Sequence, residues 1–211
     1  LSDWSSDVCS SDLQAIPIPS GPASGKLSSA MPHPAYPSAM GMRREARERA
    51  VQFLFQCDMN APEKVDEALD HFWDAQRRAA IAQASDDKAT WGEKLELPPP
   101  TAAEAALRLF ADPLIRGSLQ YRAEVDAVIQ KHAKNWEISR MAIVDRNILR
   151  LAVYEMLHRD DIPPVVSINE AVDIAKKFST DDSGKFVNGI LDKVRSELMR
   201  PSRGQAELPK P

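Results

Sequence analysis

The sequence of 211 residues has little of what marks several common classes of protein. It contains two cysteines, Cys9 and Cys57, which are too few for a disulfide framework or a cysteine-rich metal site. We therefore expect a reducing, cytoplasmic compartment. No run of about 18 apolar residues occurs, so no transmembrane helix is expected. Glycine is scarce, with 8 residues, and aromatic residues make up 6% of the chain, a composition that favours helices.

The chain also lacks an overall positive charge. It has 27 lysines and arginines against 31 aspartates and glutamates, which gives a formal net charge of −4. Nucleic-acid-binding domains are commonly basic as a whole, so any RNA site here must be a local cluster of cations. The remaining composition, 43% hydrophobic and 27% charged, is that of an ordinary globular protein.

Motifs typical of enzymes are missing as well. We find no G-x-S-x-G, H-E-x-x-H or G-x-G-x-x-G pattern. The histidines have no mutual spacing that indicates a metal site or a catalytic triad. The run Asp145-Arg146-Asn147 lies in an apolar segment, where a buried polar network that ties helices together explains it better than a catalytic carboxylate does. We therefore expect no catalytic residue, no metal and no cofactor.

The two ends of the chain differ from its middle. Residues 1–41 are mostly proline, serine, glycine and alanine without a hydrophobic period, and we expect a disordered tail. Within it, residues 1–13 (LSDWSSDVCSSDL) resemble the conceptual translation of a sequencing adapter. Residues 42–199 form the expected helical domain, with a flexible loop near 85–100 that ends in three prolines. Residues 200–211 are expected to form a second disordered tail.

Hydrophobic residues recur every three to four positions through the middle of the chain, and no convincing alternating strand pattern occurs. This periodicity predicts an all-α fold, a compact bundle of about six or seven helices. The predicted ranges are 43–59, 63–84, 101–110, 112–134, 139–158, 168–178 and 183–199. The helix at 139–158 is apolar on most sides, which indicates a central position.

Five predicted helix starts carry capping signals. They are the capping-box spacings Thr101-Ala-Ala-Glu104 and Ser167-Ile-Asn-Glu170, the N-cap and N1 pair Asp112-Pro113, the single N-cap Ser139, and Asp182 or Ser183 at the last helix.

An arginine cluster opens the first predicted helix, at Arg43, Arg44, Arg47 and Arg49. Guanidinium groups bind phosphates through paired hydrogen bonds, so this cluster could neutralise several phosphates. Arg43 and Arg47 are four residues apart and share a helix face. From the residues alone, a plain solvated helix start is the alternative, because interleaved glutamates could pair with the arginines.

The segment from Asp182 to Phe186 is the second candidate site. Free N–H groups at a helix start, together with Lys185, could hold a phosphate, and Phe186 could stack on an unpaired base. The alternative is a capped helix start with Phe186 in the core, because the glycine-rich spacing of a phosphate-binding loop is absent. Phe178, at the end of the preceding predicted helix, is expected to be a core residue.

Three segments carry a family resemblance: RREARERAVQFLFQ at 43–56, NILRLAVYEML at 147–157, and INEAVDIAKKF followed by DSGKFVNGILDK over 168–193. In this order they resemble the NusB family of bacterial transcription antitermination factors, over roughly residues 42–198. The resemblance implies two packed helical subdomains and no enzymatic activity. It implies RNA contacts at Arg43, Arg44, Arg47, Gln52, Phe55, Asp182, Ser183, Lys185 and Phe186.

The resemblance also implies partners. These are NusE, a small-subunit ribosomal protein, the single-stranded boxA RNA of ribosomal RNA transcripts, and the RNA polymerase antitermination complex. The implied function is to promote processive transcription of ribosomal RNA operons. Two alternatives stay open: the NusB-like N-terminal RNA-binding domain of a truncated RNA cytosine methyltransferase, and a helical scaffold without RNA binding.

Overall fold

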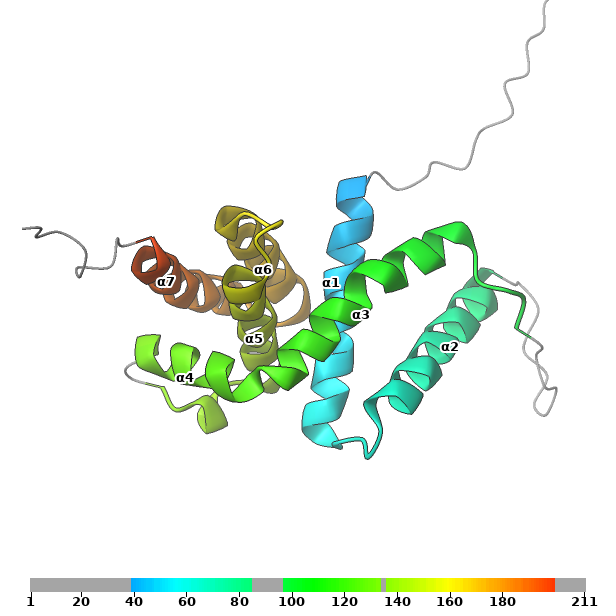
Figure 1. Cartoon of the computed structure of the whole chain (residues 1–211), viewed down its shortest axis with the longest axis horizontal. Coiled ribbons are helices and arrows are strands. Elements are labelled where there is room, and N and C mark those ends of the chain that lie inside the picture. The colour runs from blue at the N-terminus through cyan, green and yellow to red at the C-terminus, as the bar shows by residue number, and fades with distance from the viewer. Residues whose placement is uncertain (1–38, 85–96, 134–135, 200–211) are drawn as a thin grey trace, which may run out of the picture. The chain divides into compact units, whose positions relative to one another are not determined.

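The computed structural model describes residues 39–84, 97–133 and 136–199, and these parts contain seven α-helices, one 3₁₀ turn and no strand (Figure 1). The elements are α1 (Ala39–Met59), α2 (Val65–Ala84), α3 (Ala102–Gln120), α4 (Arg122–His132), η1 (Ile138–Arg140), α5 (Ile143–His158), α6 (Pro164–Phe178) and α7 (Asp181–Leu198). The predicted all-helical fold is confirmed. Most of both expected tails and of the expected loop at 85–100 lies outside the described residues.

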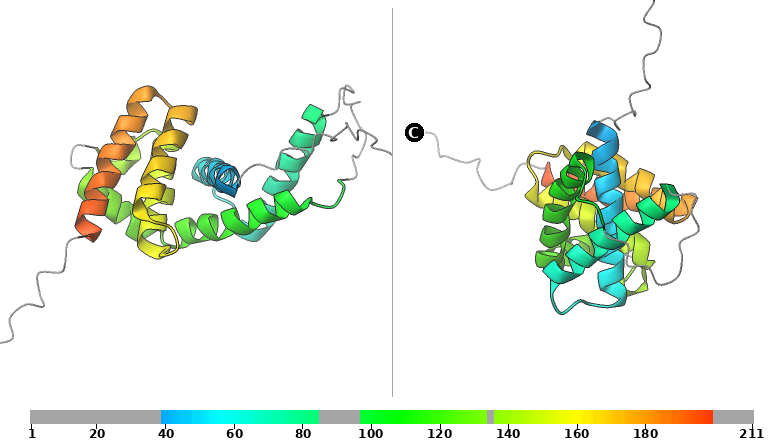
Figure 2. Two further views of the ribbon diagram at one scale, coloured as in Figure 1. Left: turned by 90° about the horizontal axis from the view of Figure 1, so that it is seen from above. Right: turned by 90° about the vertical axis from the view of Figure 1, so that its right-hand side faces the viewer.

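The helices pack in two groups, as the family resemblance implied. The first group consists of α1, α2 and α3, in which both α1 and α2 pack against α3 (Figure 1). The second group consists of α4 to α7. α5 joins the groups because it packs against α1, α3, α4, α6 and α7. α6 and α7 lie side by side as an antiparallel pair (Figure 2).

The predicted central position of the helix near 139–158 is confirmed for α5. Leu149 and Val153 are completely buried, and so are most of the residues between them. Neighbouring helices cover most sides of α5, and its buried residues include the polar Asp145, Asn147, Arg150 and Glu155 as well as apolar ones. α5 therefore positions the elements that carry the candidate site.

The helix break predicted at Asp112-Pro113 is wrong. α3 runs through this dipeptide without interruption and holds Pro113 inside it. A proline in a helix interior costs about 3 kcal/mol, because it removes one backbone hydrogen bond and crowds the preceding turn. Ala111 and Leu114, on either side of this dipeptide, are completely buried, and the burial along this face offsets that cost. The chain instead breaks at Tyr121, between α3 and α4.

The capping box at Thr101 is confirmed. Its hydroxyl accepts a hydrogen bond from the backbone N–H of Glu104 (3.2 Å), and the Glu104 carboxylate accepts one from the backbone N–H of Thr101 (2.6 Å). At α7 the cap lies slightly earlier than predicted. Thr180 is the N-cap, and its hydroxyl accepts from the backbone N–H of Ser183, so neither Ser183 nor Asp182 is the cap.

Two other predicted caps are wrong. α6 begins at Pro164, one turn before the expected capping box, because a proline at the first helical position needs no backbone partner. Ser167 therefore lies inside α6 and is buried. Ser139 lies in η1, and α5 begins later, after Ala142. In both places the pattern matched a cap, but the packing between helices set the start.

Gly117 of α3 allows a close approach to α5. A Cβ atom at this position would overlap with the ring and hydroxyl of Tyr154. Tyr154 is nearly buried, and its ring stacks on Tyr121 and His158, so it cannot move aside freely. We expect Gly117→Ala to lower the free energy of unfolding by about 1–3 kcal/mol, the usual cost of overpacking, as measured by urea denaturation.

Gly189 on α7 provides the matched control for this substitution. It is also a helical glycine, but a Cβ atom there would meet nothing within 4 Å. Gly189→Ala should leave the protein as stable or raise its stability by up to about 1 kcal/mol, because alanine is the better helix former. Equal stability changes in the two variants would contradict the close approach of Gly117 to Tyr154.

Candidate nucleic-acid interface

An open groove runs along the exposed face of α1. The opposite face of α1 is buried, with Ala46, Ala50, Phe53 and Leu54 in the core, whereas Arg49, Gln52 and Phe55 are partly exposed. Two adjoining hollows share Arg49, Gln52 and Phe178 and form this groove, which we call the α1 groove. Its main residues are Arg44, Arg49, Gln52 and Phe55 of α1, with Lys177 and Phe178 of α6.

Arg44 is half-exposed at the edge of the α1 groove and is held by α6. Its Nε and Nη2 atoms donate to the two carboxylate oxygens of Glu170, each over 2.9 Å. Nη2 also lies 2.8 Å from a carboxylate oxygen of Asp173. The hydrogen bond to Glu170 is the main reason that the pKa of Arg44 is raised above its ordinary value. Arg44 thus offers a permanent positive charge whose position is fixed by a second helix.

Arg43 and Arg47 share a helix face, as predicted, but only Arg43 is exposed. The guanidinium groups of both lie over the ring of Phe110, at 5.6 and 5.2 Å from its centre. Arg47 is only 4% exposed, and its Nε donates to the buried carboxylate of Glu155 over 2.8 Å. The structure therefore does not bring Arg47 to the surface with Arg43 and Arg44. Arg47 acts from inside the protein by tying α1 to α5.

The two groove residues that the resemblance added, Gln52 and Phe55, do lie together. Both are partly exposed and line the α1 groove beside Phe178. Gln52 accepts a hydrogen bond from Arg49 (3.3 Å), which in turn donates to Gln76 of α2. Amide groups next to an aromatic ring combine hydrogen-bonding and stacking surfaces, which is the chemistry that recognises unpaired bases.

Two groove residues of α6 were not found by sequence reasoning. Phe178 was expected in the core, but it is 37% exposed and lines the α1 groove. Lys177 lies over the ring of Phe178 at 5.2 Å and pairs with Glu48 of α1 over 2.6 Å. Their exposure could have been predicted from their position at the very end of the predicted helix, because residues at a helix end are commonly less buried than those in its middle.

The start of α7 contains surface and buried residues side by side. Asp182 and Lys185 are almost fully exposed and form an ion pair of 3.2 Å. Ser183 is buried instead, and its hydroxyl donates to the carboxylate of Asp145 on α5 (2.9 Å). The structure therefore separates the predicted group. Asp182 and Lys185 can meet a ligand, whereas Ser183 holds α7 against α5.

Phe186 packs partly against the core, with its ring edge-on to Trp136 at 6.0 Å between centres. Trp136 itself is 53% exposed and was not selected from the sequence. The side-chain amide of Gln130 binds the backbone at and just after Trp136, donating to the carbonyl of Trp136 (3.2 Å) and accepting from the N–H of Ile138 (3.1 Å). A large aromatic residue within a polar segment was the signal that could have found it.

The polar network expected at Asp145-Arg146-Asn147 is confirmed, and its centre is Asp58 at the end of α1. The buried carboxylate of Asp58 accepts from Arg146 (2.6 Å) and Asn147 (3.1 Å) of α5. Arg150 of α5 and Arg122 of α4 also donate to it, over 2.9 and 2.7 Å. This network joins α1, α4 and α5 below the α1 groove.

The pKa of Asp58 is lowered below the ordinary value of an aspartate by the sum of opposing effects. Burial raises the pKa, but the hydrogen bond from Arg146 and the positive charges of Arg150 and Arg122 outweigh it. The group therefore stays ionised at neutral pH as the negative centre of a cationic network. Its negative charge can therefore attract several arginines at once.

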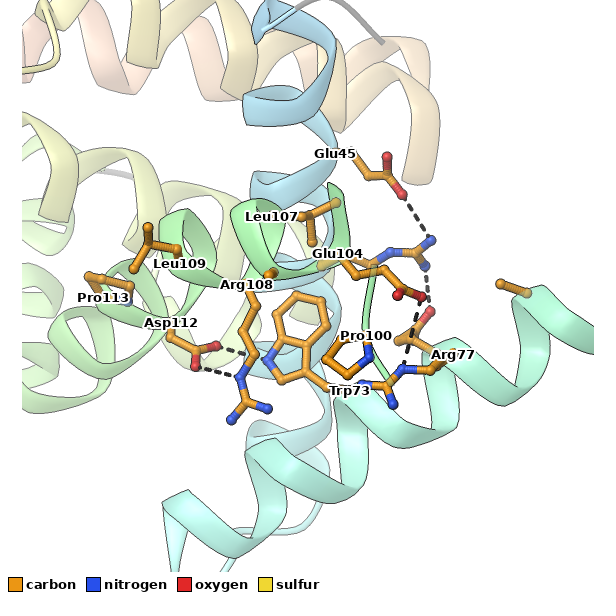
Figure 3. A pocket seen from close by; sticks show the side chains of 14 residues that line it. Glu45, Trp73, Arg77, Pro100, Glu104, Leu107, Arg108, Leu109, Asp112 and Pro113 are labelled. Carbon is orange, nitrogen blue, oxygen red and sulfur yellow. Dashed lines mark hydrogen bonds and ion pairs between the residues drawn. The ribbon is translucent and has the colours of Figure 1, made fainter. Parts of the chain in front are cut away.

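A further pocket, lined by residues of α1, α2 and α3, adjoins the α1 groove through Glu45, Arg49 and Gln76 (Figure 3). Several of its polar side chains pair with one another. The indole N–H of Trp73 donates to Asp112 (2.8 Å), and Asp112 also pairs with Arg108 (3.1 Å). Arg77 and Glu104 approach each other to 3.9 Å across the pocket. No serine, cysteine or histidine lines it, so this pocket offers no nucleophile and base pair.

The described residues also contain no group of three or more His, Cys, Asp or Glu side chains that could hold a metal ion. None of the helices in the described ranges combines the length and hydropathy needed to cross a membrane.

Comparison with known proteins identifies the family. The sequence profile of the NusB family matches residues 44–196. The chain is 42% identical over 168 residues to the transcription antitermination protein NusB of Desulforapulum autotrophicum, covering 80% of this chain and 100% of that protein. It is 43% identical over 165 residues to the NusB of Geobacter sulfurreducens, covering 78% of this chain and 100% of that protein.

Solved structures give the same result. The structure of T. maritima NusB is similar with a TM-score of 0.54 and 33% identity, over 74% of this chain and 91% of that chain. A crystal structure of the antitermination factors NusB and NusE in complex with dsRNA is similar with a TM-score of 0.52 and 25% identity, over 75% of this chain and 98% of that chain. The chain thus belongs to the NusB family of transcription antitermination proteins, which are not enzymes.

Proposed function

We propose that this protein binds boxA-type single-stranded RNA together with NusE and, within the RNA polymerase antitermination complex, promotes processive transcription of ribosomal RNA operons. Membership of the NusB family supports this proposal, and the similar solved structure of NusB and NusE with dsRNA supports the coarser part of it, namely RNA as the ligand and NusE as the partner. We assign the function to the helical domain at residues 42–199.

The observation that carries the proposal is the composition of the α1 groove. Arg44, Arg49 and Lys177 lie along one stretch of it beside Glu45 and Glu48, and Phe55 and Phe178 place aromatic surface along the next. Single-stranded RNA offers phosphates and unstacked bases together, so it can use both stretches at once. A duplex, whose bases are stacked and paired, would leave the aromatic stretch unused.

We assign the predicted site residues to two roles. Exposed residues contact RNA directly: Arg43, Arg44, Gln52, Phe55, Asp182 and Lys185. Arg47 and Ser183 are buried and position the helices that carry the site: Arg47 binds Glu155 and joins α1 to α5, and Ser183 binds Asp145 and joins α7 to α5. Phe186 supports the exposed ring of Trp136, which takes the place of Phe186 as the stacking surface for a base.

Charge reversal of Arg43 and Arg44 tests the proposal. The double variant Arg43→Glu/Arg44→Glu should bind boxA RNA more weakly, because two phosphate contacts are lost. The slope of log affinity against log salt concentration should fall by about 0.7 per lost contact on single-stranded RNA. Fluorescence anisotropy with a labelled boxA RNA over a salt series, with and without NusE, measures both quantities.

The matched control reverses two exposed arginines of α2 and α3, in the variant Arg78→Glu/Arg116→Glu, which changes the net charge by the same amount. It should leave the salt slope at the wild-type value. An equal loss of slope in both double variants would mean that the overall charge, and not the α1 groove, governs binding. Absence of RNA binding by the wild type, with or without NusE, would favour a scaffold without RNA binding.

A further inference from the structure

The cations of the α1 groove are paired with carboxylates of the same chain. Lys177 pairs with Glu48 over 2.6 Å, and Arg49 pairs with Glu45 over 3.3 Å. Arg44 has two such partners, Glu170 and Asp173 of α6. A phosphate that enters the α1 groove therefore meets arginine and lysine groups that already have an anionic partner.

The two partners of Arg44 differ in kind. Glu170 takes the Nε and Nη2 atoms in a two-point contact, and its side chain is only 12% exposed. Asp173 lies one turn further along α6, reaches only Nη2, and is 46% exposed. Glu170 thus positions the guanidinium through two hydrogen bonds, whereas Asp173 forms an exposed ion pair with it. A phosphate oxygen is attracted to the same guanidinium, because it carries a negative charge similar to that of a carboxylate oxygen.

We infer that Asp173 limits RNA affinity, because its ion pair with Arg44 in the free protein competes with RNA phosphates for this guanidinium. This inference rests on the proposed function. An exposed ion pair is weak because water screens it, so a phosphate can replace Asp173 at a small cost. The competition acts on phosphate and not on bases, and its effect should therefore be the same for RNAs of different sequence.

Removing the charge of Asp173 tests the inference. Asp173→Asn should bind boxA RNA about three- to tenfold more tightly at low salt, and the gain should shrink as added salt screens the charges. A scrambled RNA of the same length should gain by the same factor. Asp173→Glu, which keeps the charge, should bind within about twofold of the wild type. Anisotropy titrations at two salt concentrations measure these affinities, and thermal melting checks that each variant is folded.

A double-mutant cycle separates the local contact from a general effect of charge. In the Arg44→Ala background, Asp173→Asn should change RNA affinity by less than about twofold, because the shared donor is gone. Asp192→Asn is the matched control. Asp192 is exposed on α7, accepts from Asn188 (2.9 Å), and carries the same charge. Its effect should be small and should not depend on Arg44.

Three results would overturn the inference. In the first, Asp173→Asn binds RNA no more tightly than the wild type. In the second, its gain persists unchanged in the Arg44→Ala background. Both of these leave the proposed RNA-binding function intact, because wild-type binding and its weakening in Arg44→Ala are measured in the same series. In the third, the wild type does not bind RNA, and the proposed function fails with the inference.

Discussion

Arg47→Ala is expected to lower the free energy of unfolding by about 3–5 kcal/mol, the usual cost of removing one partner of a buried ion pair. Glu155 is 1% exposed, and its carboxylate accepts from Arg47 (2.8 Å) and from the hydroxyl of Ser167 (2.6 Å). Without Arg47, a buried negative charge would keep only that hydroxyl. Urea denaturation at neutral pH measures the change.

Two further variants sharpen this expectation. Arg43→Ala removes an exposed arginine from the preceding turn of α1 and should change stability by no more than about 0.5 kcal/mol. Arg47→Met/Glu155→Leu replaces both charges by apolar groups of similar size and should recover most of the loss. A loss below about 1 kcal/mol for Arg47→Ala would show that Arg47 does not pair with Glu155 in the interior and is free to contact RNA.

Asp58→Ala is the second large change, also with an expected loss of about 3–5 kcal/mol. The substitution removes the common acceptor of Arg122, Arg146 and Arg150. The side chain of Arg150 is only 5% exposed, and it would keep a single carboxylate partner, Asp126. The exposed carboxylate of Asp192 again provides the control, because Asp192→Ala should cost no more than about 0.5 kcal/mol.

The effect of Asp58→Ala should depend on pH. Because the pKa of Asp58 is lowered by folding, its charge stabilises the folded state fully above the unfolded-state value of about 3.9. This contribution is lost as the pH falls through the lower pKa of the folded state. The stability difference between wild type and variant should therefore be constant from pH 5 to 7 and narrow below about pH 4. A difference that widens in acid would contradict the lowered pKa.

Hydrophobic periodicity, which is a local signal, allowed the helices and the central position of α5 to be predicted. The family was suggested separately, by the resemblance of three sequence segments. The errors concern residues whose partners are distant in sequence. Ser167 has the spacing of a capping box, yet its hydroxyl binds Glu155 on α5. Pro113 is typical of a helix start, yet the buried face of α3 continues past it. In both cases packing between helices outweighed a local preference worth about 1–3 kcal/mol.

In the candidate site, too, the local pattern was predicted and the contacts between helices were not. The arginine cluster was visible in the sequence, but the different roles of its members were not. Arg47 meets Glu155 across 108 residues of chain, and Arg44 meets Glu170 across 126. Only the packing of α1 against α5 and α6 decides that one arginine is buried and the other exposed. A single sequence carries no signal for pairings at this distance.

The pairing of α1 with α5 and α6 also has a consequence for synthesis on the ribosome. α1 leaves the ribosome first, but Glu155 and Glu170 follow more than one hundred residues later. Until then the arginine-rich helix has a net excess of positive charge and lacks the carboxylates that later bind Arg44 and Arg47. At about 5–20 residues per second, the interval lasts several seconds or more. During this time the arginines of α1 can bind any polyanion near the ribosome. The period ends when α6 has been synthesised and Glu155 and Glu170 can pair with Arg47 and Arg44.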